Sequence, residues 1–140
     1  MFYIDTSVMV AALMEEASTS RAQIWLSAQV EGALAISDWT VTEYSSALSM
    51  KLRTRQIQGE HRSLALSTFN RVVADSFITL SASRQHFEAA ARLRDRHELG
   101  IRAADALHLA IAMDASATLV TFDHLLQRAA SSLGHPCLAP

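Results

Sequence analysis

Cysteine, proline, glycine and lysine are all scarce in this chain of 140 residues. One cysteine, Cys137, excludes an internal disulfide, and two prolines and four glycines leave no linker or low-complexity tract that would separate two domains. No apolar run approaches the roughly 18 residues that a membrane span needs. Met1 is not followed by a charged and then apolar leader. We therefore expect one domain over residues 1–140, without export signal or membrane contact, in the reducing cytoplasm.

Short apolar segments alternate with longer helical segments along almost the whole chain. The pattern predicts strands at 2–4, 34–36, 77–80 and 118–121, with a possible edge strand at 137–138. It predicts helices at 8–14, 18–31, 41–52, 83–98, 101–113 and 125–132, and one that ends near residue 75. This alternation is typical of an α/β protein with a central parallel sheet of four to five short strands flanked by helices. Ligands bind such sheets beyond the carboxyl ends of the strands.

One carboxylate interrupts the most apolar helix that the pattern predicts. Asp105 lies within residues 101–113, and at 3.6 residues per turn it shares a face with Ile101 and His108. An unpaired buried carboxylate is strongly unfavourable, so such a group is neutralised, paired or bound to a metal. We expect Asp105 to lie mid-helix, too late to cap it. We expect His108 to form a hydrogen bond in the core or beside a site rather than to act as a catalyst.

Three further acids are predicted near the carboxyl ends of strands. Asp5 and Asp123 each follow a strand and precede a helix, and Glu43 lies one to two turns into a helix that leaves the same edge. Asp38 also follows a strand, and we interpret it as a helix-start or rim residue.

Each of these acids also has a purely structural explanation. Asp5 or the neighbouring Thr6 could cap a helix, as could Asp123, for about 1 kcal/mol. Thr40 and Glu43 have the spacing of a capping box. None of these explanations applies to a mid-helix Asp105, whereas a shared site accounts for all four acids.

A cluster of four carboxylates would repel itself unless a cation lay among them. Oxygen ligands without cysteine favour Mg²⁺ or Mn²⁺ over Zn²⁺. Such a site suits the hydrolysis of phosphodiesters by metal-activated water. Eleven of the twelve basic residues are arginine, which binds phosphate in a bidentate manner.

Four segments together resemble a known family. Asp5–Ser7 after the first strand, Thr40–Glu43, Gly100–Ala112 and Leu119–Asp123 resemble, in this order and spacing, a PIN domain of the VapC toxin type. The resemblance implies one PIN domain over residues 1–140, with a three-layer α/β/α sandwich.

The resemblance also implies an activity and its partners. It implies a Mg²⁺- or Mn²⁺-dependent endoribonuclease, the toxin of a type II toxin-antitoxin pair, with an RNA substrate, a VapB-type antitoxin and a homodimeric state. Carried onto this sequence, the catalytic and metal-binding residues would be Asp5, Glu43, Asp105 and Asp123, with Thr6, Ser7 and Thr121 as polar neighbours that bind the cofactor or phosphate. Arginines at 53, 55, 92 and 96 would line the RNA groove.

A receiver-like signalling domain that uses the acids only to bind Mg²⁺ is the alternative. It has a similar length and strand–helix alternation, but it needs an acidic pair after the first strand and a late lysine. Here Thr6 follows Asp5, and the one lysine is Lys51. A phosphatase with an aspartyl nucleophile would need an acid where Ser7 stands. The mid-helix acid therefore favours the nuclease.

Overall fold

A five-stranded parallel sheet forms the centre of the computed structural model, which describes residues 1–140. The strands are β1 (Phe2–Ile4), β2 (Leu34–Ser37), β3 (Ile78–Leu80), β4 (Thr118–Val120) and β5 (Cys137–Leu138). The helices are α1 (Thr6–Leu13), α2 (Thr19–Ser27), α3 (Asp38–Arg53), α4 (Gly59–Ser76), α5 (Arg84–Asp95), the 3₁₀ turn η1 (His97–Leu99), α6 (Ala103–Asp114) and α7 (His124–Ser132). The predicted α/β architecture is confirmed. None of the helices combines the length and apolar character of a membrane span.

The order of the strands places a topological switch at the middle of the sheet. The order is β3-β2-β1-β4-β5, and every neighbouring pair is parallel. From β1 the chain moves outward to β2 and β3, then returns to the other side of β1 for β4 and β5. Crevices that bind ligands open where the strand order reverses, beyond the carboxyl ends of the strands. In this protein that point lies between the ends of β1 and β4, next to Asp5 and Thr121.

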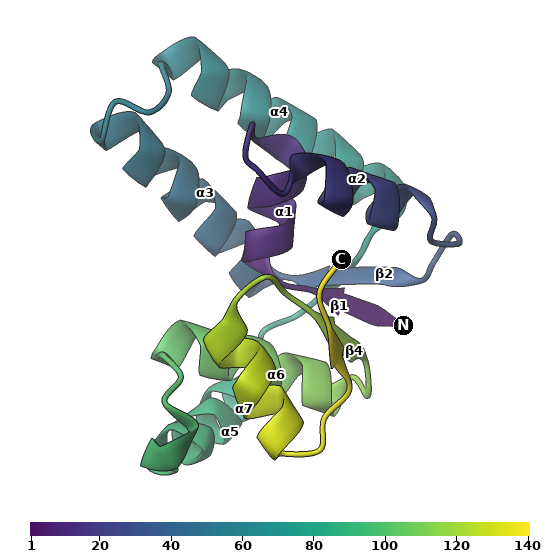
Figure 1. Ribbon diagram of the computed structural model, residues 1–140, viewed down its shortest axis with the longest axis vertical. Helices are drawn as coiled ribbons and strands as arrows, with labels where there is room; N and C mark the ends of the chain where they lie inside the picture. Colours follow the sequence, from purple (N-terminus) through teal and green to yellow (C-terminus); the bar gives the residue numbers. More distant parts are fainter.

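Helices cover the two faces of the sheet in separate groups. Helices α1 to α4 lie on one side and α5 to α7 on the other, which gives three layers (Figure 1). Successive residues of a strand point to opposite faces, so Tyr3 packs into the core under α5, α6 and α7, whereas Ile4 packs into the core under α1 to α4. Both side chains are fully buried. The sheet is therefore buried on both faces, as parallel sheets require.

Several helices begin one to three residues away from the predicted starts, and two of these shifts bear on the acids. Helix α3 begins at Asp38 rather than at residue 41, because Ser37 caps it and forms a capping box with Thr40. Helix α6 begins at Ala103 rather than at residue 101, because Gly100 adopts a left-handed conformation with φ +65° and Arg102 is extended. The predicted helix over 83–98 is divided into α5 and η1. The two shifted starts change the interpretation of Glu43 and Asp105.

Candidate active site

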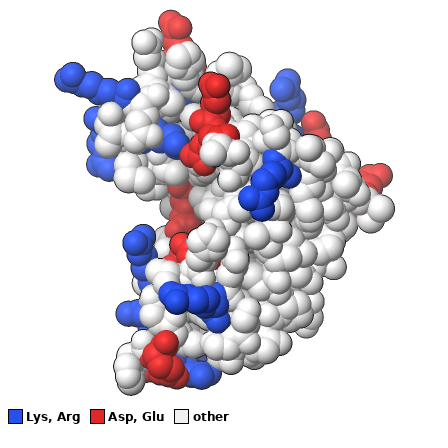
Figure 2. All heavy atoms as spheres, in the orientation of Figure 1, with Lys and Arg blue, Asp and Glu red and all other residues white.

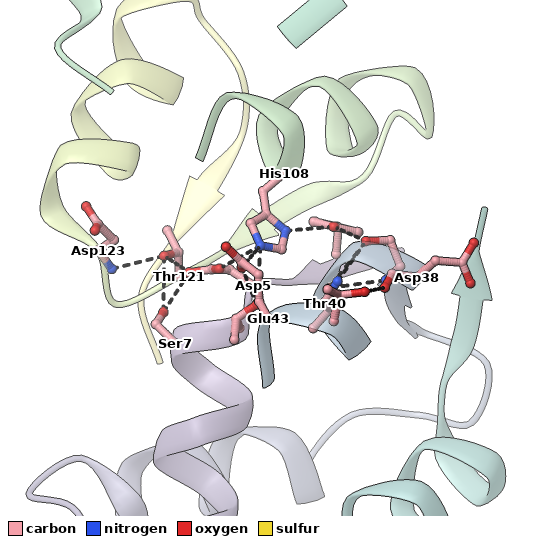
Figure 3. Close-up of polar contacts among 12 residues, drawn as sticks. Asp5, Ser7, Asp38, Thr40, Glu43, His108, Thr121 and Asp123 are labelled. Atoms are coloured by element: carbon pink, nitrogen blue, oxygen red, sulfur yellow. Dashed lines mark hydrogen bonds and ion pairs between the residues drawn. The ribbon is translucent and has the colours of Figure 1, made fainter. Parts of the chain in front are cut away.

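Asp5 is held by hydroxyl groups and not by the helix that follows it. Its backbone occupies the N-cap position of α1, but its side chain makes no capping bond. Instead Oδ2 accepts hydrogen bonds from Ser7 Oγ at 2.7 Å and from Thr121 Oγ1 at 2.5 Å. Asp5 is 6% exposed, and its Oδ1 lies 3.4 Å from Nε2 of His108. The two hydroxyls fix one carboxylate oxygen and leave the other directed at the centre of the cluster (Figure 3).

Glu43 extends from the second turn of α3 toward Asp5. Its Oε2 accepts hydrogen bonds from Thr6 Oγ1 at 2.7 Å and from His108 Nε2 at 2.6 Å. The predicted alternative of a capping box with Thr40 is wrong, because Thr40 pairs with Ser37 three residues earlier. Burial by itself raises the pKa of Glu43, but the hydrogen bond and charge of His108 and the bond from Thr6 outweigh it and lower the pKa. Glu43 is thus held as a carboxylate.

His108 joins the two acids. Its imidazole is 1% exposed and comes from α6, with Nε2 facing both Asp5 and Glu43. Burial alone would lower the pKa of His108. The charge of Asp5 and the hydrogen bond and charge of Glu43 raise the pKa by more than burial lowers it, so the net shift is upward. The expectation that His108 forms hydrogen bonds is confirmed. Ligand atoms of Asp5, Glu43 and His108 lie within 4.8 Å of one another, as in a metal centre.

Asp105 is not in the middle of its helix, contrary to the sequence-based prediction. It lies in the first turn of α6, half-buried, and its Oδ2 accepts a hydrogen bond from the backbone N–H of Arg102 at 3.0 Å. Burial raises the pKa of Asp105, and the charges of Asp123 and Asp5 add to the effect, while Arg102 and His108 oppose it. Asp105 therefore belongs to the same electrostatic cluster, although it stands outside the three residues that share ligand distances.

Asp123 does cap a helix, as the structural alternative proposed. Its Oδ1 accepts hydrogen bonds from the backbone N–H groups of Leu125 at 2.7 Å and Leu126 at 3.0 Å at the start of α7. Its own N–H donates to Oγ1 of Thr121, the same oxygen that bonds Asp5. Asp123 is thereby joined to Asp5 through one threonine. Its carboxylate does not point into the group formed by Asp5, Glu43 and His108 (Figure 3).

No lysine or arginine forms an ion pair with any of these four acids. The ion pairs of Asp5 and Glu43 are both with His108, and Asp105 and Asp123 have none. In the space-filling view, acidic atoms lie inside a notch on one edge of the molecule, with basic side chains above and below it (Figure 2). Asp38 is the first residue of α3 and is exposed, and its side chain is directed away from the cluster and accepts a bond from Ala82 N (Figure 3), in agreement with its interpretation as a helix-start or rim residue.

Sequence reasoning missed two residues of the polar network, Tyr3 and Ser37. The hydroxyl of Tyr3 lies 2.8 Å from Nδ1 of His108 and 2.7 Å from Oγ of Ser37. The signal was available: a tyrosine in a short strand that is buried on both faces needs a partner for its hydroxyl, and Tyr3 is two residues before Asp5, on the same side of the strand.

The sequence profile of the PIN domain family matches residues 2–131. The chain belongs to the PIN domain family. A search of curated protein sequences finds no match.

Solved structures of other proteins share the PIN domain architecture over their whole length. FitAcB from Neisseria gonorrhoeae is 21% identical, with a TM-score of 0.77, over 99% of this chain and 96% of that one. VapC20 from Mycobacterium tuberculosis is 17% identical, with a TM-score of 0.75, over 100% of both chains. VapBC2 from Rickettsia felis is 17% identical, with a TM-score of 0.69, over 99% of this chain and 98% of that one. At these identities the likeness establishes the fold.

Proposed function

We propose that this PIN domain is a metal-dependent endoribonuclease that hydrolyses RNA phosphodiesters and acts as the toxin of a type II toxin-antitoxin pair. One observation carries the proposal: Asp5 and Glu43 are brought together in a buried site with no lysine or arginine to balance them. Burying carboxylates without full compensation is unfavourable unless a cation binds. The upward shift in the pKa of Asp105, from burial and from neighbouring acids, supports the same conclusion.

The residues present fit a divalent cation of the Mg²⁺ or Mn²⁺ type. Asp5 and Glu43 would hold it, and Asp105 and Asp123, at the starts of α6 and α7, would add negative charge beside it. Carboxylate oxygens are the ligands that these ions prefer, and no cysteine is among the residues that share ligand distances. When bound, such an ion lowers the pKa of a water molecule and stabilises the leaving oxygen of a phosphodiester.

The protein's own side chains orient these acids. Ser7 and Thr121 hold one oxygen of Asp5, so its other oxygen faces the cluster. Thr6 and His108 hold one oxygen of Glu43 in the same way. The family resemblance implied three polar neighbours of the site. In this structure they donate hydrogen bonds to the carboxylates: Thr6 to Glu43, and Ser7 and Thr121 to Asp5.

The walls of the acidic notch suit a nucleic acid backbone. Basic side chains lie on both sides of the acids (Figure 2). We assign phosphate contacts to exposed arginines of the α3–α4 turn and of α5 and its end, namely Arg53, Arg55, Arg92 and Arg96. Cleavage by this route does not use the 2′-hydroxyl, so selection of RNA would come from these walls. Single-stranded loops are the expected target because their bases are unstacked.

The partner proposals follow from similar proteins and from exposed apolar side chains. Among similar solved structures, VapC20 is a toxin that cleaves the sarcin-ricin loop, and a structure from Klebsiella pneumoniae is a toxin-antitoxin complex. On this chain Ile24 of α2 is 70% exposed and Leu64 of α4 is 66% exposed. A cavity of about 500 Å³ lies beside Leu64, between the end of α1 and the α3–α4 hairpin. We propose that an antitoxin covers this side and that exposed Phe87 of α5 contributes to a homodimer contact.

The test is cleavage of a mixed pool of structured RNAs by the antitoxin-free protein, with Mg²⁺ or Mn²⁺ and with EDTA. We expect cleavage that requires the metal and that falls at least about 100-fold in Asp5→Asn. Asp38→Asn is the matched control, since Asp38 also follows a strand but lies outside the cluster. Equal cleavage by the parent and Asp5→Asn, or cleavage undiminished by EDTA, would overturn the proposal.

A further inference from the structure

Tyr3 presents a hydroxyl group to the interior of the protein, behind the cluster of acids. Its side chain is 0% exposed and lies in the middle strand, with its ring in the core under α5 to α7. A buried hydroxyl is favourable only when it has hydrogen-bond partners. Tyr3 has two, Ser37 at the end of β2 and His108 on α6.

These contacts form a continuous chain of hydrogen bonds that ends at Glu43. Oγ of Ser37 lies 2.7 Å from the Tyr3 hydroxyl, which lies 2.8 Å from Nδ1 of His108, whose Nε2 lies 2.6 Å from Oε2 of Glu43. Ser37 is itself fixed, because its oxygen also accepts the backbone N–H of Thr40 in the capping box of α3. These hydrogen bonds therefore connect the backbone of α3 to the acid that α3 carries, through β1 and α6.

The chemistry of the acceptors determines which ring nitrogen of His108 donates a hydrogen bond to the acids. Carboxylates without a proton can only accept, so Nε2 between Asp5 and Glu43 carries a hydrogen and donates it. Nδ1 then requires a partner that can either accept or donate, and a tyrosine hydroxyl does both. Without that hydroxyl, no side chain of the network contacts Nδ1. The orientation of the ring would then be fixed only by the contacts of Nε2 with Asp5 and Glu43.

We propose that Tyr3 is a positioning residue for the metal centre: through Nδ1 of His108 it fixes the imidazole that holds the carboxylate of Glu43 beside Asp5. The inference rests on the proposed function, because it concerns the same acids. Tyr3 contacts neither acid, so its effect must pass through His108. Partners that orient metal-site residues in this way change metal affinity by about 10- to 100-fold when removed.

The chain offers a matched control in its second fully buried tyrosine. Tyr44 is 0% exposed, lies in α3 next to Glu43 and stacks on Phe69 with ring centroids 4.1 Å apart. Its hydroxyl has no hydrogen-bond partner. Tyr44→Phe therefore removes a hydroxyl of equal burial near the same acid without touching the chain of hydrogen bonds.

The experiment is calorimetric titration of Mn²⁺ into the full chain, with the free energy of unfolding in EDTA measured on each variant. We expect Tyr3→Phe to bind Mn²⁺ about 10- to 100-fold more weakly than the parent. Tyr44→Phe should bind as the parent does. In a His108→Gln background, adding Tyr3→Phe should change the affinity by less than about two-fold, because the intermediary is already gone.

The outcomes separate this inference from the function on which it rests. If the parent binds no Mn²⁺, the proposed function fails and the inference fails with it. If the parent binds but Tyr3→Phe binds equally well, the inference alone is overturned. An equal loss from Tyr3→Phe in both backgrounds, or loss of the folded state in Tyr3→Phe, would assign Tyr3 a structural role only and would also overturn it.

Discussion

Replacing Asp105 with asparagine should stabilise the metal-free protein. Asp105 is half-buried at the start of α6, near the charges of Asp123 and Asp5. Asparagine keeps an oxygen that can accept the N–H of Arg102, so the local hydrogen bond survives while the charge is removed. Because burial and the neighbouring acids raise the pKa of Asp105 above its ordinary value of 3.8, the charged form is less favourable in the folded state than in the unfolded one.

The sign and the pH range of this effect follow from that shift. A group whose pKa is raised on folding favours the folded state below its unfolded pKa, and this contribution is lost as pH rises through the folded pKa. The advantage of Asp105→Asn should therefore be absent near pH 3 and fully present at pH 7.5. Relief of an unfavourable charge commonly contributes about 0.5 to 2 kcal/mol. We expect the lower half of that range, about 0.5 to 1 kcal/mol, because the attraction of the helix N-terminus is also lost.

Thermal unfolding in EDTA, followed by circular dichroism at pH 7.5, is the measurement. A gain of this size corresponds to about 2 to 4 °C in Tm for a chain of this length. Excess Mn²⁺ should reverse the ranking, since a ligand at 100 times its Kd stabilises by about 2.7 kcal/mol and Asp105→Asn would lose part of that. Glu31→Gln, in the exposed loop before β2, controls for loss of one negative charge. If the Tm of Asp105→Asn in EDTA is lower than that of the parent, the negative charge of the acids is already compensated in the metal-free protein and the reasoning is refuted.

Substitutions at three further positions test the fold around the site. Tyr44→Phe should leave stability unchanged or raise it by up to about 1 kcal/mol in urea unfolding, because the hydroxyl has no partner and burial raises the pKa of Tyr44 to about 12; a clear loss of stability would contradict this. Asp123→Ala should lose about 1 kcal/mol of unfolding free energy with its cap, whereas Asp123→Ser should keep the cap and still lose metal-dependent RNA cleavage; full activity in Asp123→Ser would remove Asp123 from the site. Gly100→Ala should lower the free energy of unfolding by about 1 to 2 kcal/mol, because φ is +65° although the space is open; no loss in chemical denaturation would show that the turn can relax.

The fold was largely predictable because each strand is a short apolar segment with a polar end. Burial on both faces makes β1 and β2 continuous runs of apolar residues up to Asp5 and Ser37, and the predicted ranges agree with the observed strands to within one or two residues. The strand order β3-β2-β1-β4-β5 was not predictable in this way. It depends on which face each helix packs against, and α3 and α4 carry no sequence pattern that selects one side.

The interpretation of the acids depended on where two helices begin. A left-handed Gly100 and an extended Arg102 delay α6 by two residues, which moves Asp105 from a predicted interior position to the first turn. A two-residue error at a helix start is ordinary for sequence patterns. At α3 the opposite error occurred, and the earlier start at Asp38 freed Glu43 from the capping role that its spacing with Thr40 had suggested.

In the site that we propose, capping a helix and binding a metal would not exclude each other, because acids at helix starts gather at the same edge of the sheet. Asp5 stands at the N-cap of α1, Asp123 at the N-cap of α7 and Asp105 in the first turn of α6. A helix N-terminus carries about half a positive charge, which stabilises a nearby anion by about 0.3 to 1 kcal/mol. Three helices that start at the carboxyl edge of the sheet thus hold three acids without any basic side chain that would compete with a cation.

Glu43 does not lie at a helix start, and this difference explains why a histidine contacts it. It lies in the second turn of α3, where the field of the helix terminus has fallen off. Burial alone would raise its pKa, and the bonds from His108 and Thr6 are what keep it charged. A lysine or arginine in that role would bring a permanent charge into the centre of the acids. The imidazole of His108 instead directs one N–H at Glu43 and contacts the Tyr3 hydroxyl through Nδ1, and its charge is not permanent, so Glu43 stays ionised in the site that we propose for a divalent cation.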